Sequence, residues 1–410
     1  MTTILHSGDL HLGASVAAPD PEVAPLAAGA RREALKRLVE LAKAEKADLV
    51  VLAGDIFDSP EPPLSAVMQL QWAIEQWLAN GARVAIAPGN HDPWLAGGLW
   101  AAWPASEGLA IFGPKASGLE MADLGLFLAG VAHDADWVGR DLSGLLPPPP
   151  AGLFGVGLLH ATVTSAGAAH NHQHHAPVGL ASLSAAGFGL WALGHIHLPQ
   201  RLAERPAVVY AGAPQGGHLG EPGPRGAWLH RLSGSALQSR FVPLAPLLFH
   251  DLAPADLAGV ADLSRLAGLL GRMLAADGAN PMARSCLRLT LAGPSPLAAA
   301  LKQEGEAALA LALKEALGLA GLVLHAARLL PMVGEAELAG QGHVLAAALR
   351  EMQAIVQDPA QWQALLKGLP GKPHPAGELA GGCLAPAEAM EPAKALALRR
   401  LWLGGEGEGR

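Results

Sequence analysis

Residues 190–199 read LWALGHIHLP, a short apolar run that ends in a Gly-His-x-His sequence. The run predicts a buried strand, with His195 and His197 at its end. Side chains two residues apart on an extended chain point to the same face. Imidazole is the commonest metal ligand, so the pair could bind a metal. It could also be a polar pair at a sheet end, or chance among the 17 histidines of the chain.

The chain before this run alternates strand-like and helix-like segments. Residues 2–9, 47–55 and 83–92 are predicted strands, each apolar and each ending at an aspartate. Two amphipathic helices, predicted at residues 31–46 and 64–81, separate them. The order β-α-β-α-β is typical of a sheet covered by helices, so the sequence predicts an α/β or α+β fold.

Further strands are predicted in the rest of the first 245 residues, at 124–132, 153–160, 189–195, 207–211 and 227–232. We therefore assign residues 1–245 to a first domain. The composition shifts near residue 245, and residues 246–332 predict a small α/β domain. Its strands are expected at 285–293 and 321–330, on either side of a helix from about 296 to 317. Residues 333–410 predict a helical segment that ends in a flexible, Pro- and Gly-rich tail.

Length and composition restrict the class of protein. A chain of 410 residues that is 51% hydrophobic and 16% charged has enough apolar material for two or three domains. Two cysteines are too few for a disulfide scaffold. The start of the chain lacks the basic region of a signal peptide, and there is no long unbroken apolar run. We therefore expect a soluble cytoplasmic protein.

Metal-ligand side chains follow several of the predicted strands. In α/β sheets the carboxyl edge of the strands is where sites are built, so we expect these side chains to meet there. The seven candidate ligands are Asp9, His11, Asp55, Asn90, His160, His195 and His197. The glycines before them, for example Gly54 and Gly194, would let the backbone turn and let an ion and a phosphate come close, although a simple strand-end turn is the alternative.

Seven ligands exceed the needs of one divalent ion, which takes about four to six. They suit two ions that share a carboxylate. A mixed set of carboxylates and imidazoles suits manganese, iron or zinc. Two such ions about 3.5–4 Å apart activate water for in-line attack at phosphorus.

The ordered motifs D-x-H, G-D-x-x-D, G-N-H-D, a lone strand-end His and G-H-x-H resemble those of the calcineurin-like metallophosphoesterases. This resemblance implies a β-sandwich of two mixed sheets flanked by helices. It also assigns the ligands: Asp9, His11, Asp55 and His197 to one ion, and Asp55, Asn90, His160 and His195 to the other. His91 would be the general acid that protonates the leaving oxygen, or would help to orient the phosphate. Asp92 would orient His91, and Asp58 would support the region of the bridging carboxylate.

Three more stretches narrow the resemblance to one group within this family. The N-terminal ILHSGDLHLG resembles the start of SbcD-type DNA-repair exonucleases, and residues 208–229 resemble the YhaO branch of that group. The segment at 287–297 resembles part of the domain that caps their active site. The resemblance implies a manganese-dependent exonuclease of DNA repair that acts on DNA ends or single strands. It also implies a coiled-coil ATPase partner similar to SbcC or YhaN, for which residues 333–410 are the expected docking segment. Pairing with a second copy of the chain stays open.

The charge of the chain leaves two other functions open. The net charge is −8, and residues 1–244 hold 14 Lys and Arg against 20 Asp and Glu. The chain therefore lacks the overall positive charge that is typical of proteins that bind nucleic acid. A phosphodiesterase or phosphatase for a small phosphoester is therefore the alternative enzyme, and a scaffold without activity is a third possibility. The cluster His170, His172, His174 and His175 could face the substrate, bind a third metal, or belong to a polar loop.

Overall fold

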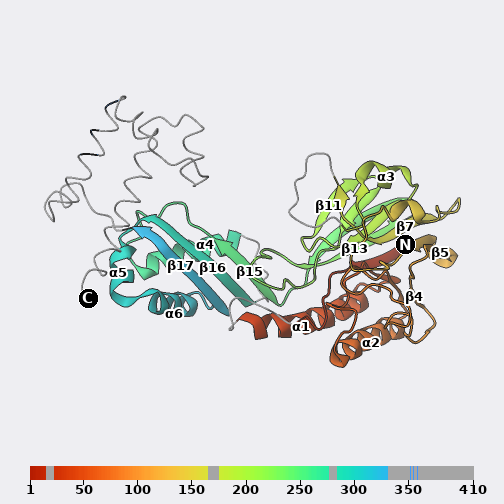
Figure 1. Cartoon of the computed structure of the whole chain (residues 1–410), viewed down its shortest axis with the longest axis horizontal. Coiled ribbons are helices and arrows are strands. Elements are labelled where there is room, and N and C mark those ends of the chain that lie inside the picture. The colour runs from red at the N-terminus through yellow and green to blue at the C-terminus, as the bar shows by residue number, and fades with distance from the viewer. Residues whose placement is uncertain are drawn as a thin grey trace. The chain divides into compact units, whose positions relative to one another are not determined.

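The computed structural model describes residues 1–14, 23–164, 175–276 and 284–330, together with Glu351, Ala354 and Asp358 (Figure 1). The described residues divide into two compact units. The first holds Met1–Asp251 with Met273–Leu287 and Gly318–Gly321, and the second holds Leu252–Arg272, Arg288–Leu317 and the residues from Leu322. The predicted boundary after residue 245 stays a prediction, and the one after residue 332 lies outside the described residues.

The first unit contains a six-stranded mixed sheet, here called sheet A. The strands, in spatial order, are β14 (Ala236–Pro243), β13 (Gly226–Ser233), β1 (Thr2–Ser7), β2 (Leu49–Leu52), β3 (Arg83–Ile86) and β4 (Leu109–Ile111). Strands β1 to β4 run parallel, whereas β13 runs antiparallel to both β1 and β14. The carboxyl ends of β1, β2 and β3 therefore meet at one edge of the sheet.

A second six-stranded sheet, sheet B, is also mixed. Its strands, in spatial order, are β11 (Gln200–Glu204), β12 (Ala207–Tyr210), β10 (Leu190–Gly194), β7 (Phe154–His160), β6 (Leu126–Gly130) and β5 (Ser117–Met121). Strands β6, β7, β10 and β12 are parallel, and the two edge strands are antiparallel to their neighbours. β7 and β10, which carry the predicted ligand histidines, are adjacent.

The two sheets pack face to face. Ile4 and Leu49 of sheet A and Leu158 and Ala192 of sheet B belong to one buried cluster. The neighbouring residues on each strand point the other way, as the two-residue period of an extended chain requires. The predicted β-sandwich of two mixed sheets is thus confirmed. The outer face of each sheet packs against helices and loops.

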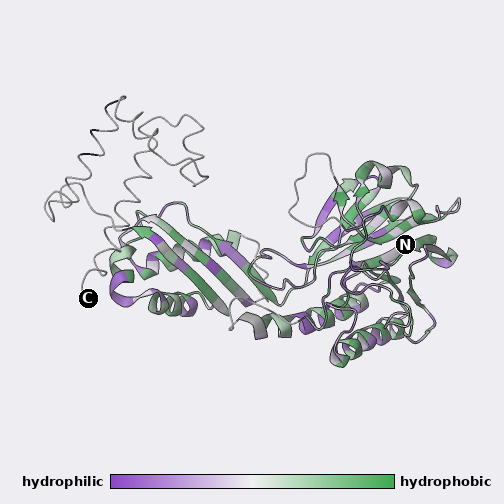
Figure 2. Cartoon of the chain, viewed as in Figure 1, coloured by the Kyte–Doolittle hydropathy of each residue, from purple (hydrophilic) through white to green (hydrophobic). Residues whose placement is uncertain are grey.

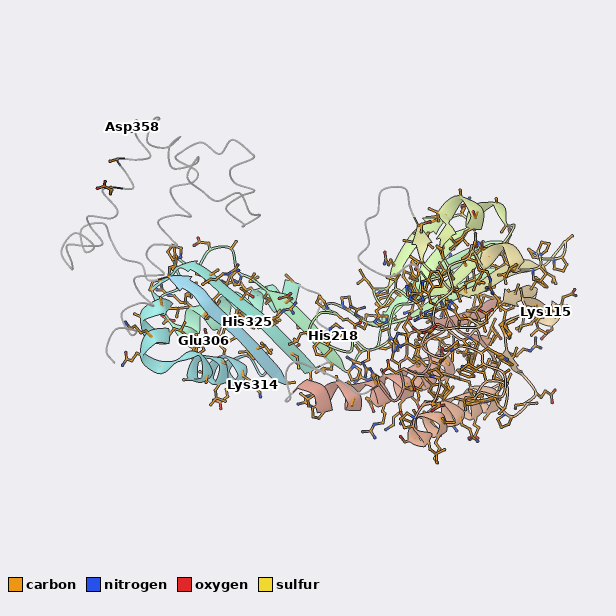
Figure 3. The ribbon with its side chains drawn as sticks, viewed as in Figure 1. Lys115, His218, Glu306, Lys314, His325 and Asp358 are labelled. Atoms are coloured by element: carbon orange, nitrogen blue, oxygen red, sulfur yellow. The ribbon has the colours of Figure 1, made fainter. Side chains whose placement is uncertain are left out.

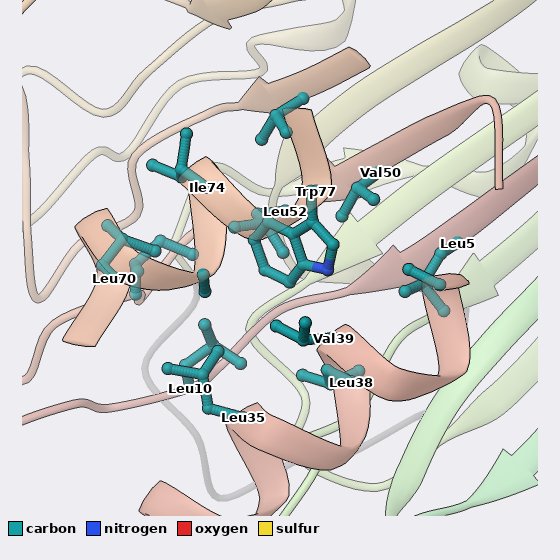
Figure 4. Close-up of a cluster of buried hydrophobic side chains, with 14 of the residues drawn as sticks. Leu5, Leu10, Leu35, Leu38, Val39, Val50, Leu52, Leu70, Ile74 and Trp77 are labelled. Atoms are coloured by element: carbon teal, nitrogen blue, oxygen red, sulfur yellow. The ribbon is translucent and has the colours of Figure 1, made fainter. Parts of the chain in front are cut away.

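Two helices cover the outer face of sheet A. α1 (Val23–Ala44) and α2 (Leu64–Ala79) bury Leu38 and Trp77 against Leu5 and Val50 of the sheet (Figure 4). We predicted α1 only from residue 31. The helix begins at Val23 because the Ala-rich segment before residue 31 favours helix, and Pro25 is tolerated in a first turn.

Short elements cover the outer face of sheet B. They are α3 (Leu180–Ala185), the 3-10 turn at Ser143–Leu145, and the parallel pair β8 (Val163–Thr164) and β9 (Val178–Gly179). A second 3-10 turn, at Ala122–Leu124, connects β5 to β6, and its Leu124 packs against the cluster between the two sheets. Trp191 and Leu193 of β10 are buried in the cluster on the outer side of sheet B. Strand β10 is therefore apolar on both faces, which explains the continuous apolar run in its sequence.

A three-stranded sheet follows, in the order β15 (Leu247–Leu252), β16 (Arg284–Pro294) and β17 (Gly321–Leu330). Along β16, buried Leu287, Leu289 and Leu291 alternate with less buried residues, and Figure 2 shows apolar and polar residues mixed along these strands. The helices here are α4 (Leu263–Ala276), α5 (Leu297–Glu304) and α6 (Glu306–Ala316).

The predicted single helix from 296 to 317 is wrong. Gly305, with φ of 84°, separates α5 from α6. That angle is left-handed, and only glycine adopts it without a steric penalty. In the part of the chain that the structure describes, none of the helices combines the length and apolar character needed to cross a membrane.

Candidate metal centre

All seven predicted ligands lie just beyond or at the carboxyl ends of parallel strands. Sheet A supplies Asp9, His11, Asp55 and Asn90 after β1, β2 and β3; sheet B supplies His160, His195 and His197 from β7 and β10. The two strand edges meet, because His160 contacts both Asn90 and Asp55. A cavity of about 290 Å³ opens beside them, lined by Asp9, His11, Asp58, His91 and His197 among others.

Backbone strain is concentrated at these strand ends. The angle φ is 50° at Asp9, 44° at His11, 48° at Asp55 and 98° at His195. Non-glycine residues rarely adopt positive φ, and each instance costs on the order of 1–3 kcal/mol. The surrounding fold therefore holds four predicted ligands in strained turns, an arrangement that is typical of functional sites.

Two glycines allow the sheets to approach at the site. A Cβ at Gly194 would lie 1.7 Å from the carbonyl oxygen of Ala53, and one at Gly54 would lie 2.4 Å from His160 Nδ1. We expected these glycines to admit an ion and a phosphate. In the structure their first role is to admit the neighbouring strand end, since a side chain at either position would push the two ligand-bearing edges apart.

A first group of possible ligands is formed by Asp9, His11 and His197, whose ligand atoms lie within 4.8 Å of one another. His11 Nδ1 lies 2.9 Å from a carboxylate oxygen of Asp58, and His197 Nδ1 contacts Glu221. Each Nδ1–H donates to its carboxylate, which leaves a lone pair on each Nε2 when the two rings are neutral. These two Nε2 atoms face each other at 3.1 Å. Two lone pairs at that distance repel, and a cation bound by both removes the repulsion.

A second group is formed by Asp9, Asp55 and His160. His160 Nδ1 donates to the carbonyl oxygen of Ala53 at 2.9 Å, so its Nε2 is the ring atom left to bind a proton or a metal ion. That Nε2 lies 3.0 Å from Asn90 Oδ1 and 3.2 Å from Asp55 Oδ2. These oxygens accept from Nε2–H when the ring is protonated, and a metal ion can take the place of that proton.

The charges of the second group favour an added positive charge. Burial by itself would lower the pKa of His160, but the carboxylates of Asp55 and Asp9 outweigh it and raise that pKa to about 9. Burial raises the pKa of the Asp9 carboxyl. Burial, together with the positive charge of His160, lowers the pKa of His195 to about 2, so His195 is a neutral imidazole, the form that binds metals.

Two further atoms of the predicted ligands have no hydrogen-bond partner in the described part of the chain. Asp9 Oδ2 and His195 Nε2 are buried and have no hydrogen-bond partner among the described residues. A buried acceptor without a partner costs free energy, so a native protein supplies one. The residues present thus fit divalent metal ions. Asp55 Oδ2 lies 3.2 Å from His160 Nε2 and 3.8 Å from His11 Nε2, so it faces both groups, as the predicted bridging role requires.

His91 lies at the mouth of the site. Its side chain is 44% exposed, its ring lies 4.8 Å from that of His11, and its Nδ1 lies 3.3 Å from the carbonyl oxygen of Asp58. Its backbone N–H donates to Asp55 Oδ1 at 2.9 Å. The sequence therefore placed His91 correctly beside the ligands, and its catalytic role stays a prediction.

Asp92 does not orient His91 as we expected. Its carboxylate is buried and accepts hydrogen bonds from the backbone N–H groups of Gly89, Ile56 and Phe57, at 2.8, 2.9 and 3.1 Å. These contacts tie the turn after β3 to the turn after β2. Burial and the nearby charge of Asp55 raise its pKa to about 8. The side chain that holds a histidine here is instead that of Asp58, which contacts His11.

Sequence reasoning missed Glu221, which contacts His197 Nδ1 and accepts a hydrogen bond from the backbone N–H of Gly217 at 2.6 Å. Burial by itself would raise the pKa of Glu221, but the hydrogen bond and charge of His197 lower it to about 2. Glu221 lies in a Gly-rich loop without strand or helix periodicity. No local signal distinguishes it from other loop acids.

Two further histidines surround the second group. His133 Nε2 donates to the carbonyl oxygen of His160 at 2.6 Å, and the ring of His175 lies 5.2 Å from that of His195. Of the predicted histidine cluster, only His175 is among the described residues; His170, His172 and His174 lie outside them. His175 thus reaches the site, while nothing in the sequence distinguished it from its neighbours.

Comparisons with known proteins agree with this geometry. Residues 2–199, which contain every predicted ligand, match the family model of the calcineurin-like phosphoesterases. The uncharacterized metallophosphoesterase YhaO of Bacillus subtilis is 26% identical over 310 residues, which is 72% of each chain. The DNA double-strand break repair protein Mre11 of Aeropyrum pernix is 34% identical over 96 residues, 22% of this chain and 21% of that protein. One subunit of the nuclease SbcCD of Escherichia coli is 31% identical over 90 residues, again 22% and 21%.

Proposed function

We propose that this protein, whose residues 2–199 match the family model of the calcineurin-like phosphoesterases, is a two-metal hydrolase that cleaves the phosphodiester backbone of DNA at its ends. Manganese is the proposed metal, and a coiled-coil ATPase is the proposed partner. Hydrolysis of a phosphoester is the general activity that the family indicates. The DNA substrate, the exonuclease activity, the metal and the partner are the specific parts of the proposal.

The observation that carries the proposal is the convergence of ligand atoms at the joined strand edges. His11 and His197 Nε2 face each other at 3.1 Å, and His160 Nε2 lies 3.0 Å from Asn90 Oδ1 and 3.2 Å from Asp55 Oδ2. In the proposed assignment Asp9, His11, Asp55 and His197 hold one ion, and Asp55, Asn90, His160 and His195 hold the other. When bound, the pair of ions supplies an activated water and neutralises charge on the phosphate.

His91 is the proposed general acid. Its Nδ1 contacts the Asp58 carbonyl oxygen, which leaves Nε2 available to protonate the leaving oxygen. An imidazole suits this task because it exchanges its proton near neutral pH. Its exposure at the cavity allows contact with a substrate, whereas the buried histidines of the site face the metal positions.

The DNA substrate is supported by the names of two relatives, a double-strand break repair protein and a nuclease subunit. The acidic balance of residues 1–244 opposes it, because DNA binding depends on cation–phosphate contacts. Two divalent ions add positive charge at the site. The proposed ATPase would supply more, docking on residues 333–410, which lie outside the described residues except for Glu351, Ala354 and Asp358.

A second candidate is a phosphodiesterase for a small phosphoester. The acidic balance and the cavity of about 290 Å³ favour it, since a small ester fits there without an extended basic surface.

The deciding experiment is manganese-dependent cleavage of end-labelled linear DNA, run beside bis-p-nitrophenyl phosphate, with and without the candidate ATPase. His91→Ala is the test variant. His325→Ala, in β17 of the other unit (Figure 3), is the matched control. We expect His91→Ala, and not His325→Ala, to lose cleavage of DNA. If only the small ester is cut, even at low salt and with the ATPase present, the DNA proposal is wrong and the second candidate replaces it.

A further inference from the structure

We propose that Arg31 is the phosphate-binding cation of this site, and that its guanidinium holds the non-bridging oxygens of the substrate phosphate beside the metal ions. The inference rests on the proposed phosphoester hydrolysis. It adds the residue that recognises the anionic group, and it is independent of whether the substrate is DNA or a small ester.

Arg31 reaches the site from α1, an element that carries none of the predicted ligands. Its side chain lines the same cavity as Asp9, His11, His91 and His197. Among the described residues that line this cavity, Arg31 alone is an arginine or a lysine. A phosphate in the cavity therefore meets this guanidinium before any other permanent cation of the described chain.

One donor group of Arg31 is not used by the described residues. Its Nη1 is buried and has no hydrogen-bond partner in the described part of the chain. A buried guanidinium N–H without an acceptor is costly, and native proteins satisfy such groups with a ligand, an ion or water. Because the guanidinium borders the metal cavity, the acceptor that fits is an anion bound there. Arginine suits phosphate, since its planar fork can donate two parallel hydrogen bonds.

The polar neighbours of Arg31 are already engaged. Gln215 donates to the carbonyl oxygens of Gly216 and Leu247 and accepts from the Leu247 N–H. Glu221 accepts from His197 and Gly217. Gln215 and Glu221 are thus satisfied within the wall, whereas Arg31 keeps a permanent charge and a donor that the described residues leave unused.

Two features keep Arg31 charged and in place. Burial lowers its pKa, while the charges of Asp58 and Glu221 raise it. Guanidinium groups in proteins stay protonated in any case. Its Nη2 packs on Gly217, where an added Cβ would lie 2.5 Å away. The same two carboxylates orient His11 and His197, so the phosphate cation and the metal ligands share their supports.

The test compares Arg31→Gln with Arg32→Gln, which removes the same charge from the next, exposed position of α1. A third variant, Gly217→Ala, keeps the charge but displaces the guanidinium. Manganese content is measured first. Inorganic phosphate is then titrated by calorimetry into each manganese-loaded protein, and KM and kcat are measured with bis-p-nitrophenyl phosphate.

We expect Arg31→Gln to bind two manganese ions as the parent protein does, but to weaken phosphate binding roughly 10- to 100-fold, as befits a charge-assisted contact. Gly217→Ala should weaken it less, and Arg32→Gln by less than about twofold. Phosphate binding within twofold of the parent in Arg31→Gln would overturn the inference. Loss of manganese by that variant would overturn it too, because Arg31 would then support the ligands rather than the substrate. If DNA is not cleaved but phosphate binding still depends on Arg31, the inference stands and the DNA proposal fails.

Discussion

Replacing Glu221 by Gln tests whether His11 and His197 bind a metal ion through their Nε2 atoms. The two carboxylate oxygens of Glu221 accept from two donors, His197 Nδ1–H and the Gly217 N–H. A Gln side chain has only one accepting end, so one donor must lose its partner whichever way the amide turns.

The structure sets the expected size of this effect. If His197 loses its partner, its ring is free to turn and its Nε2 is no longer held 3.1 Å from His11 Nε2. Removing the hydrogen-bond partner of a ligand histidine weakens metal binding about 10- to 100-fold, or about 1.4–2.7 kcal/mol. A buried donor without a partner costs on the order of 1–3 kcal/mol, which agrees with that range.

The assay is a calorimetric titration of manganese into metal-free protein. Only the ion held by His11 and His197 should bind more weakly in Glu221→Gln, and the second should bind as before. The matched control is Glu204→Gln, since the side chain of Glu204 is 76% exposed and pairs with Arg201 on the surface. The amide oxygen of the Gln side chain can still accept from His197, so Glu221→Ala, which removes both acceptors, is measured beside it. Two unchanged binding steps in Glu221→Ala would refute the assignment of His197 Nε2 to a metal.

Three further predictions concern catalysis, packing and the metals. His91→Ala should lower kcat for bis-p-nitrophenyl phosphate by about 10²- to 10⁴-fold with manganese content unchanged; retained activity would remove His91 as the acid. Gly194→Ala should lower the free energy of unfolding by at least about 1–3 kcal/mol in a denaturant titration, because its Cβ would lie 1.7 Å from the Ala53 carbonyl oxygen. Gly29→Ala, in α1 with no atom within 4 Å of the new Cβ, should instead stabilise by roughly 0.5–1 kcal/mol. Manganese at a hundred times the dissociation constant of each site should stabilise the metal-free protein by about 2.7 kcal/mol per bound ion, or about 5.4 kcal/mol for two, in a thermal melt; Asp55→Asn should reduce this gain at the same manganese concentration, and an equal gain in that variant would argue against a bridging carboxylate.

The sequence by itself determined the strands that carry the ligands and the positions of the ligands along them. Strand β10 was predictable because a strand buried on both faces has a continuous apolar sequence, and its end carries His195 and His197. The same signal marks β2 and Asp55. Since parallel strands present their carboxyl ends at one edge, order along the chain was enough to predict that these residues meet.

Only the tertiary structure decided which side chains support the ligands. Asp92 follows His91 directly, yet its buried carboxylate binds backbone N–H groups of two turns. Glu221 and Arg31 reach the site from a Gly-rich loop and from α1, far from the ligands in sequence. A side chain that acts through one long-range contact leaves no periodic pattern in the sequence. Its role depends on the direction in which a folded loop or helix presents it, and packing alone fixes that direction.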